Sequence, residues 1–167
     1  MKIVRIKFSN VPVPLNERLT VVPLDAEALR GGAHFVSGMR RAGKKRVTHV
    51  MRLTYKYSQW MKKEASILAY TKRENKIPTF KGSCVAVLLF TPPLDNKPHD
   101  SDGVVKGPFD VLTRSQIIKD DSQIKAFTVL ESAPKGKGGM TMFLGADYGT
   151  NDIAAHLDLL KTVLSEK

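Results

Sequence analysis

The residues best suited to catalysis or metal binding are aspartates in two nearby segments, 100–110 and 120–121. The side chains that matter are Asp100, Asp102, Lys106, Asp110, Asp120 and Asp121. Hard divalent cations such as Mg²⁺ bind several carboxylate oxygens held in a rigid frame, so we expect Asp100, Asp102 and Asp121 to hold a metal ion that activates water. Lys106 would place its positive charge against a phosphoryl oxygen. The pattern predicts hydrolysis of a phosphodiester.

A purely structural interpretation competes with the catalytic one. An aspartate at the start of segment 100–110 would cap a helix, and Lys106 would pair with Asp102 and Asp110, four residues away on either side. The pair Asp120-Asp121 would begin a turn. Because aspartates separated by one residue occur by chance in many chains, spacing alone favours this structural interpretation.

The chain that must position these residues has the size and composition of a single folded domain. It contains 167 residues, 42% of them hydrophobic, and its one cysteine, Cys84, lies inside an apolar run. One cysteine excludes a disulfide framework and a cysteine-rich zinc site, and it fits a reducing cytoplasm. That apolar run is too short to cross a bilayer, so we expect no membrane partner.

Hydrophobic periodicity predicts one α/β domain, residues 1–167, with a mixed β-sheet flanked by helices. Alternation marks residues 2–8 as a half-buried strand, and residues 83–91 are apolar on both faces, as in a central strand. A strand over 122–130 is expected to form a hairpin with 140–144 through a turn at 133–139. These strands are the expected frame of the site.

Three helices are expected around the sheet. The first is capped by Thr54 and runs to about Arg73, with Tyr57 and Trp60 in the core rather than stacked on bases. The second spans 104–112 and should kink or restart at Pro108. The third is a terminal amphipathic helix whose apolar line has 4-3-4 spacing, and packing of this line within the protomer is favoured over packing on a partner. The line consists of Ile153, Leu157, Leu160 and Leu164.

The charge of the chain points to a polyanionic partner. Its 27 Lys+Arg and 16 Asp+Glu give +11 at pH 7, and each cation placed against a phosphate releases a condensed counterion. Basic residues gather beside glycines in an insertion at about 24–46, expected to be a loop or loose hairpin returning through 47–52, and in the turn at 133–139. They are Arg40, Arg41, Lys44, Lys45, Arg46, Lys135 and Lys137. Nucleic acid is the first candidate, although solvated loops or anionic lipid would satisfy the same count.

The acidic segments resemble the signature of the RusA-type Holliday-junction resolvases. That signature has an aspartate pair in D-x-D-N-x-x-K, an aspartate four residues beyond the lysine, and D-D-x-Q-[IV] opening the next strand. The matching residues run from Asp100 to Asp110 and from Asp120 to Ile124, with Gly103 in place of the family's asparagine. More loosely, residues 12–18 resemble the family's amino-terminal P-P-S-x-N stretch, and residues 135–139 resemble its basic hairpin turn.

The resemblance implies a RusA-like fold and a cytoplasmic, bacterial or phage-encoded endonuclease that nicks opposed strands of four-way DNA junctions. It also implies a homodimer, which suits paired cuts on a two-fold symmetric junction, with Mg²⁺ or Mn²⁺ as cofactor and no nucleotide cofactor. The residues it makes catalytic are Asp100, Asp102, Lys106 and Asp121, whose three aspartates bind the metal. Asp110 and Asp120 become supporting carboxylates, and Asn16 and Arg18 join the basic clusters as DNA contacts.

Two other functions stay open at the level of sequence. One is a non-catalytic basic DNA-binding protein, in which the acidic cluster is only a helix cap and a set of surface ion pairs. The other is a nuclease of the same fold that acts on other branched or flapped DNA. Cutting of a synthetic four-way junction, compared with a linear duplex in Mg²⁺ and in EDTA, distinguishes all three.

Overall fold

The computed structural model of the protein describes residues 1–9, 11–12, 19–23, 49–94, 101–146 and 151–165. Its elements are β1 (Lys2–Phe8), β2 (Leu19–Pro23), β3 (His49–Leu53), α2 (Tyr55–Glu74), β4 (Cys84–Thr91), α3 (Ser101–Arg114), the 3₁₀ turn η3 (Asp121–Gln123), β5 (Ile124–Glu131), β6 (Gly139–Ala146) and α4 (Asp152–Ser165). The expected mixed α/β architecture is confirmed. Within these ranges no helix is both long and apolar enough to span a membrane.

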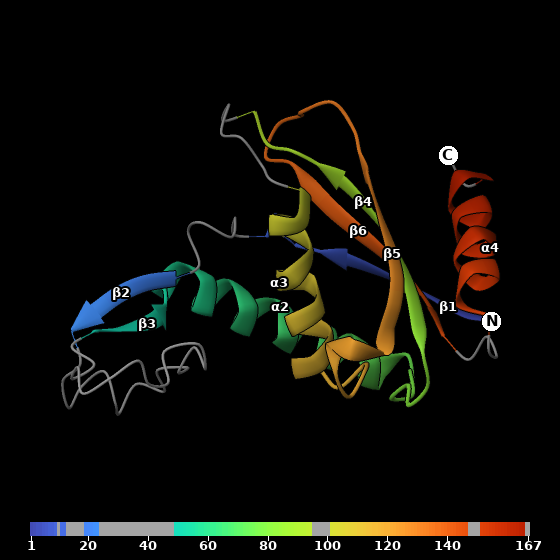
Figure 1. The fold of residues 1–167 in the computed structure, drawn as a ribbon, viewed down its shortest axis with the longest axis horizontal. Coiled ribbons are helices and arrows are strands. Elements are labelled where there is room, and N and C mark those ends of the chain that lie inside the picture. The colour runs from blue at the N-terminus through green and yellow to red at the C-terminus, as the bar shows by residue number, and fades with distance from the viewer. Residues whose placement is uncertain (10, 13–18, 24–48, 95–100, 147–150, 166–167) are drawn as a thin grey trace, which may run out of the picture.

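Four strands form one mixed sheet in the order β1-β6-β4-β5 (Figure 1). β4 lies inside this sheet, parallel to β5 and antiparallel to β6, and β6 also pairs antiparallel with β1. Residues 84–88 of β4 are fully buried, because both faces of the strand are covered and its sequence is apolar on both. The central strand predicted at 83–91 is confirmed.

Helices cover both faces of this sheet (Figure 1). α2 and α3 pack on the face that carries Ala86 and Leu88, where the larger of two hydrophobic cores forms. α4 packs on the opposite face, against Val85, Val87 and Phe143. The candidate carboxylates of α3 and η3 therefore lie on the α2 and α3 side of the sheet.

α2 begins at the predicted cap. The Thr54 hydroxyl accepts a hydrogen bond from the Tyr57 amide at 3.3 Å, which satisfies one of the free donors at the helix start. Trp60 is 7% exposed and stacks between Phe8 and Tyr57, with ring centroids 6.3 and 6.0 Å away. The assignment of Tyr57 and Trp60 to the core is confirmed.

The restart expected in α3 at Pro108 is wrong, because the helix continues unbroken from Ser101 to Arg114. Proline removes one amide donor from the helix interior. The apolar face formed by Val105, Phe109 and Leu112 is buried in the core on either side of it. Packing of this face therefore sustains the helix through the missing hydrogen bond.

The predicted hairpin between β5 and β6 is also wrong. β4 lies between these two strands, and residues 132–138 cross its end. The Ser132 amide donates to the Phe90 carbonyl at 2.9 Å, and the Lys135 amide donates to the Pro92 carbonyl at 3.0 Å. A strand that is apolar on both faces is best buried inside a sheet. β4 therefore lies between β5 and β6, and these two strands do not pair as a hairpin.

Gly138 is a tight point of this crossover. Its φ is +71°, and a Cβ there would lie 2.7 Å from the Thr91 carbonyl oxygen and 2.8 Å from the Pro93 nitrogen. We expect Gly138→Ala to lower the free energy of unfolding by about 3 kcal/mol, because left-handed backbone costs an L-residue about 1–2 kcal/mol and the backbone clash adds to it. Gly136→Ala is the matched control, with φ +52° and no described atom within 4 Å of the added Cβ. Urea denaturation showing equal losses would contradict this account.

α4 buries a different face from the predicted one. The residues facing the sheet are Ala155, Leu159 and Val163. Ile153, Leu157 and Leu164 are 74%, 50% and 55% exposed, and Leu160 is half-buried. The helix is apolar over a wide arc, so two neighbouring rows compete for the sheet. The expectation that the 4-3-4 line packs within the protomer is wrong for its three exposed members.

The second, smaller sheet is the antiparallel pair of β2 and β3. Leu19 lies opposite Leu53 and Pro23 opposite His49. β3 confirms a returning strand near the expected range 47–52, whereas β2 was not predicted. Residues 24–46, where the basic insertion falls, lie outside the described residues.

Candidate active site

Lys106, in the second turn of α3, is the centre of the acidic cluster. Its Nζ lies 3.1 Å from Asp110 Oδ1, one turn further along the helix. The same ammonium donates a hydrogen bond to Oδ2 of Asp121, the first residue of η3. The two segments singled out in the sequence therefore meet at one lysine.

Lys106 and Asp121 are brought together by α3, and not by the adjoining ends of β4 and β5. β4 and β5 are parallel, so the end of β4 and the start of β5 lie at opposite ends of the sheet. α3 follows β4 in the chain and packs against η3, which opens β5. The return of the helix brings Lys106 to Asp121.

Tyr57 of α2 fixes the other side of Asp110. The phenol is 2% exposed, and its hydroxyl donates a hydrogen bond to Asp110 Oδ2 at 2.6 Å. A buried tyrosine needs an acceptor for its hydroxyl, and this requirement was the one sequence signal that could have linked Tyr57 to a polar site. Asp110 is thus held between Tyr57 and Lys106, with one carboxylate oxygen for each.

These residues line an open cavity of about 470 Å³. Its lining consists of Tyr57, Met61, Lys106, Asp110, Thr113, Arg114, Asp120 and Asp121. Arg114, in the last turn of α3, adds a second cation that the sequence pattern did not identify. The volume is in the range of sites that bind small ligands or parts of larger ones.

The local charges keep Lys106 protonated. Partial burial disfavours its ammonium form, but the hydrogen bonds and charges of Asp121 and Asp110 outweigh that cost and raise the pKa of Lys106 above its usual value. The pKa of Asp120 is lowered, chiefly because Ser122 donates hydrogen bonds to its carboxylate. At neutral pH the Lys106 ammonium and the Asp120 carboxylate are therefore both charged.

Asp120 and Gln123 hold η3 in place. Asp120 Oδ1 accepts from the Ser122 amide at 2.9 Å, and Gln123 Oε1 accepts from the amides of Lys119 and Asp120. Gln123 Nε2 also donates to the Gly82 carbonyl at 2.6 Å, which ties η3 to the start of β4. The structural interpretation of the 120–121 pair is confirmed for Asp120, whose carboxylate caps η3, while Asp121 turns to Lys106.

The remaining candidates are placed less fully. Asp102 lies in the first turn of α3, but its side chain is not described, and Asp100 lies outside the described residues, as do Asn16, Arg18, Arg40, Arg41, Lys44, Lys45 and Arg46. Lys135 and Lys137 are exposed in the crossover after β5, at the opposite end of that strand from Asp121. In the described part of the chain, no three His, Cys, Asp or Glu side chains form a group that could hold a metal ion.

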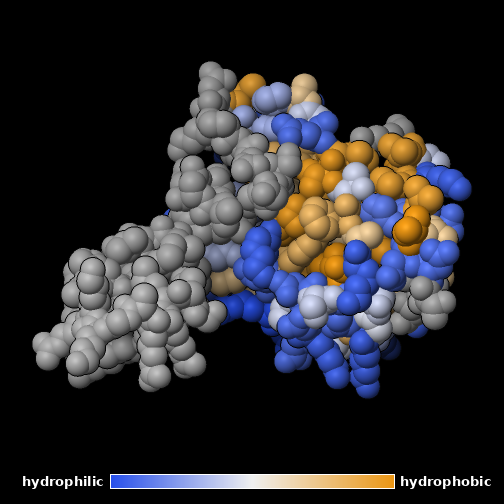
Figure 2. All heavy atoms as spheres, viewed as in Figure 1, coloured by the Kyte–Doolittle hydropathy of each residue, from blue (hydrophilic) through white to orange (hydrophobic). Residues whose placement is uncertain are grey.

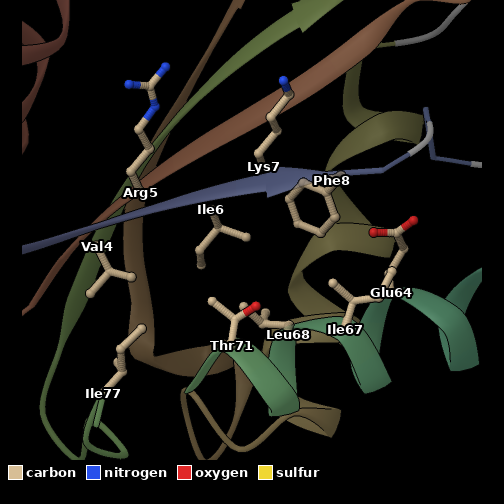
Figure 3. A pocket seen from close by; sticks show the side chains of 10 residues that line it. All are labelled: Val4, Arg5, Ile6, Lys7, Phe8, Glu64, Ile67, Leu68, Thr71 and Ile77. Atoms are coloured by element: carbon tan, nitrogen blue, oxygen red, sulfur yellow. The ribbon is translucent and has the colours of Figure 1, made fainter. Parts of the chain in front are cut away.

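A second hollow, between β1 and α2, has a structural explanation (Figure 3). It measures about 60 Å³ and is mostly apolar, with Ile6, Leu68 and Ile77 among its lining residues. Its one carboxylate, Glu64, is buried and accepts hydrogen bonds from the Ser9 amide at 3.0 Å and from the Ser9 hydroxyl. Glu64 thus closes the end of β1 and contributes nothing to the acidic cluster.

No protein-family model matches the chain, and no curated protein sequence is significantly similar to it. The resemblance to the RusA-type resolvases therefore stays a prediction from the two acidic segments. What the geometry adds is the meeting of Lys106, Asp110 and Asp121 in an open cavity.

Proposed function

We propose that the protein is a metal-dependent endodeoxyribonuclease that acts as a homodimer and resolves four-way DNA junctions by paired nicks. The observation that carries the proposal is the charged Lys106, held by Asp110 and Asp121 on the wall of an open cavity. These residues belong to the two segments that resemble the RusA signature. The net charge of +11 supports a nucleic-acid substrate.

Lys106 would act on the charge that develops during phosphodiester hydrolysis. A fixed ammonium beside the phosphoryl oxygens stabilises the transition state more than the ground state, because negative charge grows there. Asp110, itself held by Tyr57, keeps the ammonium aimed into the cavity. Arg114 provides a second cation on the same wall for a neighbouring phosphate.

The donor set suits a hard divalent cation. Asp121 presents carboxylate oxygens on the cavity wall, and Asp102 precedes Lys106 by four residues in the same helix. Asp100, Asp102 and Asp121 would hold Mg²⁺ or Mn²⁺, which when bound supplies a polarised water and neutralises phosphate charge. Lys106 would then exchange its bond with Asp121 for one with a phosphoryl oxygen.

A cleavage assay on three DNAs tests the proposal. A synthetic four-way junction, a linear duplex of the same sequence and a flapped duplex are incubated with the protein in Mg²⁺ and in EDTA. We expect paired nicks in the junction, in Mg²⁺ alone, and little product from the linear duplex. Cutting confined to the flapped DNA would replace the junction with another branched substrate.

The non-catalytic DNA-binding protein remains the second candidate because of one observation. Lys106 already pairs with both Asp110 and Asp121, and the Asp120 carboxylate accepts from the Ser122 amide, so all four side chains have partners within the chain and need no ligand. This arrangement would serve a purely structural cluster equally well. Salt-sensitive binding of the junction with no Mg²⁺-dependent product would establish that function instead.

Tyr57→Phe tests the hydrogen bond that fixes Asp110. We expect kcat on the junction to fall about tenfold with unchanged binding. Losing one hydrogen bond to a charged group costs about 1.5 kcal/mol, and Asp110 positions Lys106, which is proposed to act only in the transition state. Tyr70→Phe is the control, since Tyr70 lies on the same helix and is 58% exposed. Single-turnover cleavage and gel-shift binding measure the two quantities. A parental rate for Tyr57→Phe would remove Tyr57 from the site.

The exposed crossover lysines should contribute to the salt dependence of DNA binding. We expect the Lys135→Ala/Lys137→Ala variant to lower the slope of log affinity against log salt by about 1.8, since each phosphate contact contributes about 0.9. Lys161→Ala on α4, on the opposite face of the sheet from α3, is the control and should keep the parental slope. Fluorescence anisotropy across salt concentrations gives both slopes. Equal slopes for the parent and both variants would mean that the crossover lysines do not contact DNA phosphates.

A further inference from the structure

β5 forms one edge of the sheet, and no other strand of the described part pairs with its outer side. The strand is eight residues long, has no proline, and exposes 48% of Phe127. Long, flat edge strands with apolar side chains are templates for pairing with another strand. This edge therefore offers a surface on which another strand can pair.

We propose that the partner is a second copy of this chain, paired with β5 antiparallel about a two-fold axis at Thr128. In this register Lys125 of one copy lies opposite Glu131 of the other, Phe127 opposite Val129, and Ala126 opposite Leu130. Lys125 and Glu131 are the only charged residues of β5, and the symmetry pairs them twice. Opposite charges in directly facing positions stabilise an antiparallel pair, whereas like charges destabilise it.

Other registers and the other edge do not offer this match. A shift by two residues places Lys125 opposite Val129 or Ala133, so the charge pairs are lost. β1, at the other edge of the sheet, carries Lys2, Arg5 and Lys7 and no acidic residue. No antiparallel pairing of β1 with its own copy can bring opposite charges together. Of the two edge strands of the four-stranded sheet, only β5 can therefore pair opposite charges with its own copy.

The apolar line of α4 extends the same surface. The Thr128 hydroxyl and His156 Nε2 are 2.8 Å apart, which ties α4 to β5, and Leu160 of α4 packs against the same buried cluster as Ala126 and Leu130 of β5. The exposed Ile153, Leu157 and Leu164 follow Leu160 around the helix, on the side of His156. Figure 2 shows hydrophobic side chains gathered on this face of the molecule, over β5 and the adjoining side of α4. A two-fold axis at Thr128 brings the two copies of this line together.

The pairing gives the homodimer of the proposed function its geometry, and this step rests on that function. A two-fold axis perpendicular to the joined sheet keeps both Lys106 sites on one face of it. From Thr128 to Asp121 there are four strand residues and one 3₁₀ turn, about 20 Å, so the sites lie about 40 Å apart. Antiparallel pairing also brings the crossover of the second copy, with Lys135 and Lys137, to the end of the joined sheet where Asp121 lies.

A disulfide at the axis tests the interface. Facing residues of an antiparallel pair have Cα atoms about 4.5–5.5 Å apart, which is within the range of disulfides. We expect Thr128→Cys to form a covalent dimer on mild oxidation. Lys125→Cys, which lies far from its own copy, should stay uncrosslinked, and Lys125→Cys/Glu131→Cys should crosslink. The parent should also stay uncrosslinked, because its only cysteine, Cys84, is buried.

Charge reversal supplies a second test with folded, surface-substituted variants. We expect Lys125→Glu and Glu131→Lys each to raise the dimer Kd about tenfold in sedimentation experiments, and the double variant to restore it. Leu157→Lys should weaken the dimer by a similar factor. The interface is overturned if the parent is monomeric at micromolar concentration. It is also overturned if the protein is a dimer but Thr128→Cys does not crosslink, or if the double variant dimerises as weakly as the single variants. Cleavage assays separate the two proposals: a β5-linked dimer that cuts no DNA overturns the nuclease, and a cutting dimer indifferent to these changes overturns the interface.

Discussion

Asp121→Asn is expected to bind a four-way junction at least as tightly as the parent and to cut it about a hundredfold more slowly or worse. Asp121 presents a negative charge on a wall that must receive a phosphate, so its loss eases metal-free binding. The same change removes a carboxylate that would hold the metal, and losses of one electrostatic group at a reacting centre are typically about a hundredfold. Binding is measured in EDTA and cleavage in saturating Mg²⁺.

Asp158→Asn is the matched control for this variant. Asp158 is an exposed aspartate on α4, on the far side of the sheet from Lys106. Replacing it with asparagine removes the same charge without changing the site. We expect it to cut at the parental rate. If Asp121→Asn also cuts at a near-parental rate, the catalytic assignment fails and the aspartates return to a structural role.

Lys106→Ala is expected to cut the junction about a hundredfold more slowly while binding it with a small loss. The lysine is proposed to act on phosphoryl oxygens in the transition state, so its removal affects the rate far more than the affinity. Its ion pairs are half exposed, and exposed pairs contribute about 0–1 kcal/mol to folding. The variant should therefore unfold in urea close to the parent, which separates a catalytic loss from a loss of structure.

Lys119→Ala controls for the loss of one positive charge near the site. Lys119 is exposed and precedes η3, and its backbone amide rather than its side chain bonds to Gln123. We expect parental cleavage from it. Equal losses in Lys119→Ala and Lys106→Ala would mean that net charge near η3 matters and that the position of Lys106 does not.

Local patterns of the sequence predicted the elements well. The alternation of β1, the two-sided apolar run of β4 and the threonine cap of α2 are each set by residues close together in the chain. The pairing order of the strands is a different kind of property. Whether β5 joins β6 directly or leaves room for β4 depends on what covers each face of the sheet, which no local pattern contains. The same limit explains why the sequence pattern selected the wrong apolar row of α4 as the one that packs on the sheet.

In the candidate site too, contacts between residues close in the chain were predictable from the sequence, and contacts made by tertiary packing were not. The four-residue spacing of Lys106 and Asp110 on a helix predicted their ion pair from the sequence. Tyr57 lies 53 residues from Asp110, and its hydrogen bond exists because α2 and α3 pack on the same face of the sheet. Arg114 reaches the cavity for a similar reason. Tertiary packing alone adds these two side chains to the site.

The pairing of β1 with β6 has a consequence for the nascent chain during synthesis. Lys2 finds its sheet partner in Ala146, and a ribosome that adds roughly 5–20 residues per second needs about 7–30 s to make the residues between them. During that interval β1 has an apolar row, Val4, Ile6 and Phe8, and no strand beside it. Arg5 and Lys7 alternate with that row, Lys2 precedes it on the same face, and charges in such positions discourage association with other nascent strands. The cations of β1 thus protect the strand before the sheet that will bury it exists.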